Sequence, residues 1–256
     1  MSTQPKGTAL ITGAGKRIGR TLALHLGKAG YGVGVHYRSS EKDAQDVAAE
    51  IVRNGGKAAC VRADLSKENE TAALIENART ALGAPVSLLI NNASVFENDD
   101  LDTMTRKSWD QHIETNLRAP LKLAQDFAQQ NESLDNPLII NIIDQRVLKP
   151  TPQFLSYSTS KGALFNLTTT LAQALGPRGI RVNGIGPGPI LQNARQSEED
   201  WRKQNEATIL GHGATPDDIA HTVDYFIKAS AVTGQMIAVD GGQHLAWQTP
   251  DVMVNE

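Results

Sequence analysis

Seven short apolar runs, separated by longer stretches with helical spacing, constrain the fold of this chain more than any other feature. The runs lie at about residues 8–12, 31–37, 57–65, 86–94, 138–143, 179–185 and 233–240. The run at 138–143 lacks the alternation of a half-solvated strand, so it is typical of a strand buried on both faces. The pattern predicts an α/β fold, in which one doubly wound domain (residues 1–256) has a seven-stranded, mainly parallel sheet with helices on both faces.

The composition is that of an ordinary soluble globular protein, with 40% hydrophobic residues, 21% charged residues and a net charge of −3. This charge gives no reason to expect nucleic acid or an anionic membrane as a partner. There is no 18-residue apolar run, and the first residues, MSTQPKG, lack the apolar region of a signal peptide, so we expect a cytoplasmic protein. With a single cysteine, Cys60, and no metal-ligand spacing among the histidines, we expect neither an internal disulfide nor a metal site.

A glycine-rich turn follows the first apolar run. TALIT at residues 8–12 leads into GAGKRIGR and then into an amphipathic stretch, which is the order strand, turn, helix. Gly13 and Gly15 would let the backbone turn tightly and approach a pyrophosphate, and Gly19 would let the helix pack closely. The glycines are two and four residues apart, which departs from G-x-G-x-x-G. In its strand–helix context the turn still predicts dinucleotide binding in a Rossmann-type domain.

The end of the second strand predicts which nicotinamide cofactor binds. In a dinucleotide fold, an Asp or Glu here would bond the ribose 2′-hydroxyl, whereas an Arg accommodates a 2′-phosphate. The sequence offers Tyr37, Arg38, Ser39 and Ser40, with no carboxylate before Glu41. A guanidinium and hydroxyl donors suit phosphate, so we predict NADPH rather than NADH.

The stretch 138–164 carries the residues with the clearest chemical potential. Asp144 follows a buried strand, where ligands bind in open α/β sheets, and Tyr157 and Lys161 lie four residues apart in a predicted helix. An unperturbed tyrosine, with a pKa of about 10, donates its proton reluctantly at pH 7. A lysine ammonium one turn away would lower that pKa toward the range that a general acid needs.

Taken together, these motifs make the chain resemble a short-chain dehydrogenase/reductase. The resemblance is carried by TGAGKRIG at 12–19, Asp64, NNAS at 91–94, Asn116, the YSTSK segment at 157–161, and PG at 187–188. It implies that Tyr157 is the proton donor, that Lys161 lowers its pKa and holds the nicotinamide ribose, and that Asn116 steadies a proton-relay water. It further implies cofactor contacts from Gly13, Gly15, Lys16, Arg17, Ile18, His36, Tyr37, Arg38, Ser39, Asp64, Leu65, Asn92, Ala93, Ser94, Tyr157, Lys161, Pro187, Gly188 and Ile190.

Two departures from the common family pattern narrow the resemblance. Arg17 stands where the motif TGxxxGxG has its second glycine, and Asp144 stands where the family has its catalytic serine, with no serine until Ser156. Both changes resemble the pteridine reductases, a branch that reduces dihydropterins and folates with NADPH. That branch also has an aromatic residue soon after NNAS, which stacks on the pterin, and Phe96 stands there.

These substitutions fit a pterin chemically. An ionised Asp144 accepts hydrogen bonds only, so it cannot donate to a substrate carbonyl as a serine does. A pterin presents amino and ring N–H donors, and reduction of its C=N bond requires a proton on nitrogen. We therefore predict substrate contacts from Arg17, Ser94, Phe96, Asp144 and Tyr157, and catalytic roles for Asp144, Tyr157, Lys161 and Asn116.

Two other functions stay open at this point. One is a carbonyl reductase, such as a 3-oxoacyl thioester reductase, in which Ser156 or a water replaces the missing serine. The other is a non-catalytic NADPH-binding protein, which the intact Tyr157–Lys161 pair speaks against.

The segment 190–214 has one short helical pattern and is expected to be a substrate lid. The family resemblance implies a homotetramer. The tail carries apolar residues, Trp247 and Val252–Val254, that are expected to be exposed and to cross a subunit boundary.

Overall fold

All seven predicted strands form, and they make one sheet in the order β3-β2-β1-β4-β5-β6-β7 with every neighbouring pair parallel. The computed structural model describes residues 6–130, 134–193 and 195–253. The strands are β1 (Thr8–Ile11), β2 (Gly32–Tyr37), β3 (Lys57–Arg62), β4 (Leu88–Asn91), β5 (Leu138–Ile142), β6 (Arg181–Pro187) and β7 (Met236–Val239). The predicted seven-stranded parallel sheet is therefore confirmed.

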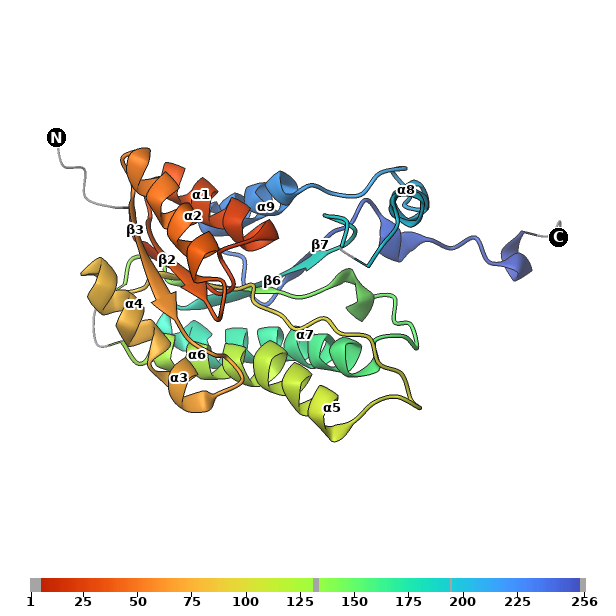
Figure 1. Ribbon diagram of the computed structural model, residues 1–256, viewed down its shortest axis with the longest axis horizontal. Coiled ribbons are helices and arrows are strands. Elements are labelled where there is room, and N and C mark those ends of the chain that lie inside the picture. Colours follow the sequence, from red (N-terminus) through yellow and green to blue (C-terminus); the bar gives the residue numbers. More distant parts are fainter. Residues whose placement is uncertain (1–5, 131–133, 194, 254–256) are drawn as a thin grey trace.

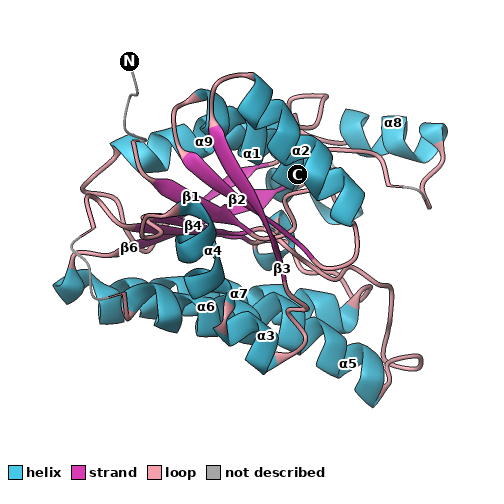
Figure 2. Cartoon of the chain, turned by 60° about the vertical axis from the view of Figure 1, so that its left-hand side comes forward, coloured by secondary structure: helices cyan, strands magenta, loops and turns pink. Residues whose placement is uncertain are grey.

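Helices cover both faces of this sheet (Figure 1). One layer contains α1 (Arg17–Lys28), α2 (Glu41–Arg53) and α9 (Pro216–Lys228). The other contains α3 (Glu68–Ala72), α4 (Leu74–Leu82), α6 (Ala119–Ala128) and α7 (Leu155–Leu175). Figure 2 shows α5 (Arg106–Ile113) at one end of the second layer and α8 (Glu198–Glu206) standing out from the first.

Each helix layer supplies its own half of the hydrophobic core. Leu22 and Leu26 of α1 are four residues apart, so they share a face, and they pack with Phe226 of α9 against one side of the sheet. Leu123 and Phe127 of α6 have the same spacing and pack against the other side. Because both faces are covered, the strands are apolar throughout, which explains the continuous runs in the sequence.

The carboxyl edge of the sheet is where the predicted site residues gather. β1 lies between β2 and β4, and the chain crosses from β3 to β4, so the strand order reverses beside β1. Ligands of open α/β sheets bind at such a switch point. Gly13 follows β1, Asn92 follows β4 and Asp144 closely follows β5, which brings three distant parts of the sequence to one edge.

Two elements differ from expectation. The helix predicted at about 109–130 consists of α5, a π-helical turn (Glu114–Arg118) and α6, and such turns are common at functional sites. The last strand was expected to be buried, but β7 is only partly buried because it is an edge strand that pairs with β6 alone in the described sheet. Among the helices that the structure describes, none is both long and apolar enough to cross a membrane.

Candidate active site

The residues predicted to contact cofactor or substrate all line one cavity of about 1100 Å³ at the carboxyl edge of the sheet. This volume slightly exceeds the range of about 300–1,000 Å³ that is usual for a site of one small molecule. Asn116 is the exception among the predicted residues, because it is fully buried beneath the cavity wall. Within the described ranges, no group of three or more metal-ligating side chains is arranged to hold a metal ion.

The glycine turn after β1 is held by contacts from β2 and from the residues that follow β4. The Gly13 N–H donates to Nδ1 of His36 (2.9 Å), and Thr12 Oγ1 accepts from the backbone N–H groups of Asn92 and Ala93 (both 2.9 Å). Gly13 has φ 65°, and a Cβ on Gly19 would lie 2.2 Å from the Gly13 carbonyl oxygen, so both positions require glycine.

The start of α1 fits a pyrophosphate. Its N-cap residue, Lys16, makes no side-chain capping bond, and no acidic residue lies in the first turn. The first N–H groups of the helix therefore have no side-chain cap, and the positive end of the helix dipole lies at the cavity wall. An uncapped helix start beside a tight glycine turn is the arrangement that binds the phosphates of a dinucleotide.

His36 supports the turn from below. Its Nδ1 accepts from Gly13, and its Nε2 lies 3.1 Å from the Ala63 carbonyl, so the neutral ring donates through Nε2. Burial lowers the pKa of His36 to about 4, which keeps the ring neutral at physiological pH. The sequence placed His36 among cofactor contacts, and the structure shows in addition that its ring fixes the turn.

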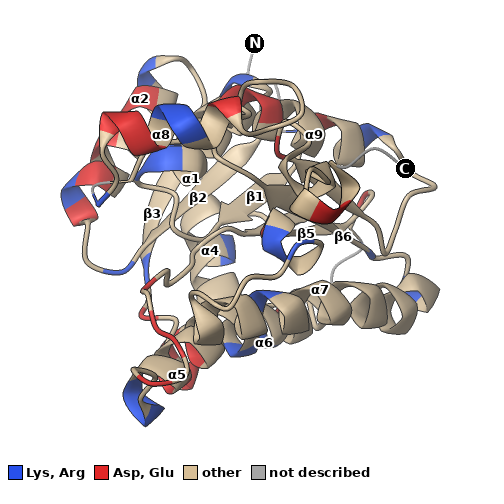
Figure 3. Cartoon of the chain, turned by 90° about the vertical axis from the view of Figure 1, so that its right-hand side faces the viewer, with Lys and Arg blue, Asp and Glu red and all other residues tan. Residues whose placement is uncertain are grey.

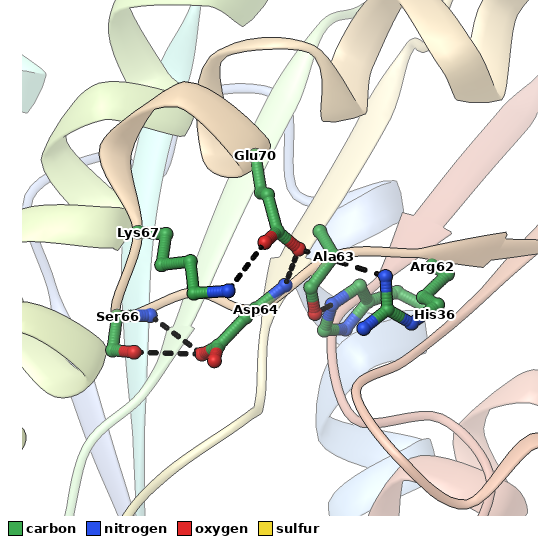
Figure 4. Close-up of polar contacts among 7 residues, drawn as sticks. All are labelled: His36, Arg62, Ala63, Asp64, Ser66, Lys67 and Glu70. Atoms are coloured by element: carbon green, nitrogen blue, oxygen red, sulfur yellow. Dashed lines mark hydrogen bonds and ion pairs between the residues drawn. The ribbon is translucent and has the colours of Figure 1, made fainter.

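The ends of β2 and β3 form the far end of the cavity. Tyr37, the last residue of β2, lines it together with Arg38 and Ser39, and Asp64 lines it after β3. Figure 4 shows how the Asp64 turn is fixed: its carboxylate accepts from the N–H (3.1 Å) and hydroxyl (2.7 Å) of Ser66, and its own N–H donates to Glu70 (2.8 Å). Burial raises the pKa of Asp64, but the Ser66 bonds and Arg38 outweigh it and the pKa is lowered.

Asn116 clamps the segment that follows β4. In the π-helical turn, its Oδ1 accepts from the Val95 N–H (2.8 Å) and from Ser94 Oγ (3.2 Å). Its Nδ2 donates to the Val95 carbonyl (3.0 Å) and to Ser160 Oγ (3.1 Å). Asn116 thus holds the backbone that leads to Phe96, a contact that the sequence did not predict.

Asp144 contacts Tyr157, and Lys161 lies beside the Tyr157 ring. The Tyr157 hydroxyl donates to Asp144 Oδ2 (2.7 Å), while Asp144 Oδ1 accepts from the Arg146 N–H (2.8 Å). Lys161 Nζ donates to the Ile142 carbonyl (2.8 Å) and lies 5.8 Å from the centre of the Tyr157 ring. Figure 3 shows α7 nearly free of charged residues; Lys161 is the only one in its sequence.

Aromatic rings form one wall beside this trio. The Phe96 ring stacks on Phe154, with centroids 4.5 Å apart and planes 7° apart, and meets Tyr157 edge-on at 4.7 Å. Phe154 is the N-cap residue of α7 and has φ 56°, which is uncommon for a bulky residue. Such strain is often found at ligand sites.

The segment 190–214 is attached to both sides of the cavity. The Arg17 guanidinium donates to the carbonyls of Leu191 (2.9 Å) and Gln192 (3.0 Å). Across the cavity, Arg195 pairs with Glu97 (2.6 Å) and donates to the Phe96 carbonyl (2.8 Å). The sequence predicted Arg17 as a contact for pyrophosphate and substrate; in the structure its guanidinium binds this segment.

Comparison with known proteins agrees with this geometry. Residues 7–203 match the family model for short chain dehydrogenases. The chain belongs to the short-chain dehydrogenase/reductase family. A curated relative, 3-oxoacyl-[acyl-carrier-protein] reductase FabG of Staphylococcus epidermidis, is 33% identical over 242 residues, covering 93% of this chain and 99% of its own.

Two solved structures are more similar in sequence. FolM alternative dihydrofolate reductase 1 from Brucella suis, in complex with NADP, is 42% identical with a TM-score of 0.92, covering 97% of this chain and 99% of that one. The protein of the same name from Brucella canis, also complexed with NADP, is 40% identical with a TM-score of 0.91, covering 97% and 98%. The likeness to the pteridine reductase-like branch is thereby supported across nearly the whole chain.

The pKa values of Tyr157 and Lys161 correct one expectation drawn from the sequence. Burial, and then the Asp144 carboxylate, raise the pKa of Tyr157 well above its usual value. Burial also lowers the pKa of Lys161 to about 8, against the opposing effect of Asp144. The expected lowering of the Tyr157 pKa by Lys161 is therefore wrong for this arrangement, because the ammonium is directed at a backbone carbonyl and a carboxylate contacts the hydroxyl.

A second correction concerns Ser156, which was considered as a replacement for the family serine. It is fully buried, its hydroxyl bonds Asp99 and lies 2.9 Å from His112 Nδ1, and its N–H donates to Asp99 (3.0 Å). Ser156 therefore faces away from the cavity and cannot replace that serine.

Among the lining residues that sequence reasoning missed, three surround Phe96. Phe154, Arg146 and Arg195 line the cavity around Phe96. Arg146 and Phe154 lie in the loop between Asp144 and α7, and Arg195 lies in the segment 190–214. Neither region has the periodicity or spacing that would have singled them out.

Proposed function

We propose that this protein is an NADPH-dependent reductase of a dihydropterin or folate-type substrate. The observation that carries the proposal is the 2.7 Å hydrogen bond from Tyr157 to the carboxylate of Asp144. In place of a serine donor, the site presents an acceptor beside its tyrosine hydroxyl. Such a pair suits a substrate with N–H groups to be bound and a ring nitrogen to be protonated.

In the proposed reaction, Asp144, Tyr157 and Phe96 have separate roles. NADPH, when bound, supplies the hydride. Asp144 accepts hydrogen bonds from the amino and ring N–H groups of the substrate and so orients the C=N bond. Tyr157 donates the proton of its Oη to the substrate nitrogen. Phe96 offers its ring as a stacking surface for the pterin.

NADPH is the cofactor in this proposal. Support comes from Arg38 and Ser39 at the end of β2, where a 2′-phosphate needs a cation and hydroxyl donors. Further support comes from the two FolM structures, both of which contain NADP.

Two substitutions test the proposal. Asp144→Ser and Phe96→Ala should each lower NADPH oxidation with 7,8-dihydrobiopterin, dihydromonapterin or dihydrofolate, while NADPH binding is retained. Asp144→Ser restores the donor that carbonyl reduction wants, so activity on a ketone substrate should not fall in parallel. Unchanged dihydropterin activity in both variants would contradict the proposal.

A 3-oxoacyl thioester reductase is the second candidate, favoured by the likeness to FabG. Because Ser156 is buried, a water would have to donate to the substrate carbonyl. Good turnover of acetoacetyl thioesters that is indifferent to Phe96→Ala would favour this candidate. A third reading, a non-catalytic NADPH-binding protein, would require that no substrate shows a rate that depends on Tyr157.

We further propose that residues 190–214 act as a substrate lid, since this segment contacts both Arg17 and the Phe96 loop. A homotetramer in the cytoplasm also stays a prediction. Trp247, Val252 and Met253 are 58%, 49% and 61% exposed, so the tail offers apolar surface for a subunit boundary; Val254 lies outside the described residues. A monomer in sedimentation equilibrium would refute the tetramer.

A further inference from the structure

The guanidinium of Arg146 forms no ion pair with a described carboxylate. It lines the cavity two residues after Asp144, and its Nη1 is buried with no hydrogen-bond partner. Among the described residues its side chain has neither an ion pair nor a hydrogen bond. Burying part of a guanidinium without an acceptor is costly, so the position is most easily explained if a ligand provides one.

Glu97, which follows Phe96, and the cavity-lining residues Asp100, Asp144 and Asp200 have other partners. Glu97 pairs with Arg195, Asp100 accepts from Thr103 (2.7 Å for the hydroxyl), and Asp200 accepts from Ser197 (2.6 Å). Asp144 accepts from Tyr157 and from the Arg146 backbone N–H. None of these carboxylates forms an ion pair or a side-chain hydrogen bond with Arg146 among the described residues.

Aromatic contacts hold the guanidinium in place. Its carbon lies 4.8 Å from the centre of the Phe154 ring and 5.6 Å from that of Phe96. These ring contacts use none of the N–H donors of the guanidinium, which therefore remain without an acceptor among the described residues. An arginine held in this way is prepared for two parallel hydrogen bonds to a carboxylate.

A chain of ring contacts, through Phe154 and Phe96, connects Arg146 with Tyr157. Phe96 contacts Tyr157 on one side and stacks on Phe154, next to Arg146, on the other. A substrate ring bound against Phe96 and Tyr157 would thus direct a long substituent toward Phe154 and Arg146. Arg195, 5.9 Å from the Phe96 ring centre, adds a second cation, and its exposed pair with Glu97 is of a kind that contributes little stability.

We propose that Arg146 and Phe154 form a specificity site for a substrate tail, in which Phe154 contacts an aromatic group and Arg146 binds a carboxylate beyond it. This inference rests on the proposed function and sharpens its substrate class. The preferred substrate is a dihydropterin that carries an aromatic amide ending in carboxylates, as in dihydrofolate, over one with a short uncharged side chain.

The test compares kcat/KM for 7,8-dihydrofolate and 7,8-dihydrobiopterin at saturating NADPH. Arg146→Met should lower the ratio of the two by about 10- to 100-fold, the size expected for a charge-assisted bidentate contact, mainly through KM for dihydrofolate. Arg146→Lys keeps the charge but lacks the two parallel N–H donors of the guanidinium, so its ratio should lie between those of Arg146→Met and wild type. The matched control is Lys149→Gln, which removes an exposed charge in the same loop outside the cavity lining and should leave the ratio unchanged.

A binding measurement separates this inference from the proposed function. N-(4-aminobenzoyl)-L-glutamate, the tail alone, should bind the wild-type protein in calorimetry, and about 10-fold or more weakly to Arg146→Met. If wild type reduces neither pterin, the proposed function fails, and the tail titration alone decides the specificity site. An unchanged kcat/KM ratio, or equal tail binding by wild type and Arg146→Met, would overturn the specificity site while leaving the proposed function intact.

Discussion

The cavity has two sides, whose polar groups are satisfied in different ways. On the cofactor side, around the glycine turn, the Gly13 N–H has a buried partner in His36, and the Asp64 turn is closed by Ser66. On the substrate side, around Phe96, Arg195 reaches the Phe96 carbonyl from the segment 190–214, and the Arg146 side chain contacts aromatic rings but has neither a hydrogen bond nor an ion pair among the described residues.

The polar groups of the cofactor side are therefore positioned before a ligand binds, whereas some on the substrate side lack a polar partner among the described residues. A turn whose donors and acceptors are paired internally has one shape, which suits a cofactor that is common to a whole family. A wall of stacked rings and an unpaired cation suits a variable substrate, because changing a few side chains changes what binds. Tyr157 and Lys161 stand where the two sides meet.

The largest expected effect is at that meeting point. Tyr157→Phe removes the proposed proton donor and should lower kcat on a dihydropterin by about 10²- to 10⁴-fold. NADPH binding, followed by nucleotide fluorescence, should persist because the glycine turn is untouched. A variant that retains most of its kcat would show that the proton comes from elsewhere.

The pH dependence of stability reports on Lys161. Its folded pKa of about 8 is below the unfolded value of about 10.5, so between these pH values the unfolded chain holds more protons. The free energy of unfolding should therefore rise with pH from 8 upward, by at most about 1.4 kcal/mol per pH unit from this group.

Denaturant unfolding of the protein without nucleotide, between pH 7.5 and 9.5, measures this rise. Lys161→Met is the reference, because it retains the opposing contribution of Cys60, whose pKa is raised by burial. A difference between wild type and Lys161→Met that does not change with pH would contradict the lowered pKa.

Cofactor choice should depend on the cofactor side alone. Arg38→Gln removes the cation at the end of β2 and should lower kcat/KM for NADPH by about 10- to 100-fold, the size of a charge-assisted contact, with little effect on NADH. Arg53→Gln, an exposed change of the same kind at the end of α2, should alter neither. Equal losses with both nucleotides would argue against a 2′-phosphate contact.

The smallest expected effect is on the substrate side. Ser156→Ala removes one hydroxyl donor from the buried Asp99, which keeps its bond from the backbone N–H at position 156, so the change should cost about 1 kcal/mol of stability and loosen the loop that carries Phe96. KM for the dihydropterin should rise, while KM for NADPH should not. Ser158→Ala, two residues on at a more exposed hydroxyl, is the matched control. A rise in both KM values would mean that the two sides are not independent.

More of the cofactor side than of the substrate side could be predicted from the sequence. The seven strands and the glycine turn could be predicted because local patterns determine them: buried apolar runs, and glycines at a positive φ or a close approach such as Gly13 and Gly19. Tyr157 and Lys161 could be placed because they are four residues apart in a predicted helix. Asp144 could be placed because it follows a predicted buried strand.

The rest depends on contacts distant in sequence. Nothing near Arg195 indicates that it would meet Glu97, almost one hundred positions earlier, and nothing near Ser156 indicates Asp99. The π-helical turn that aims Asn116 at Val95 has no sequence signature. The raised pKa of Tyr157 also depends on burial and on the direction of the Lys161 side chain, which spacing alone does not reveal.

The most direct test of the central claim is a competition between substrate classes for wild-type protein. NADPH oxidation is followed with 7,8-dihydrofolate, 7,8-dihydrobiopterin and an acetoacetyl thioester under the same conditions. The Asp144–Tyr157 pair predicts a higher kcat/KM for at least one dihydropterin than for the thioester. Turnover of the thioester with none of either dihydropterin would contradict it.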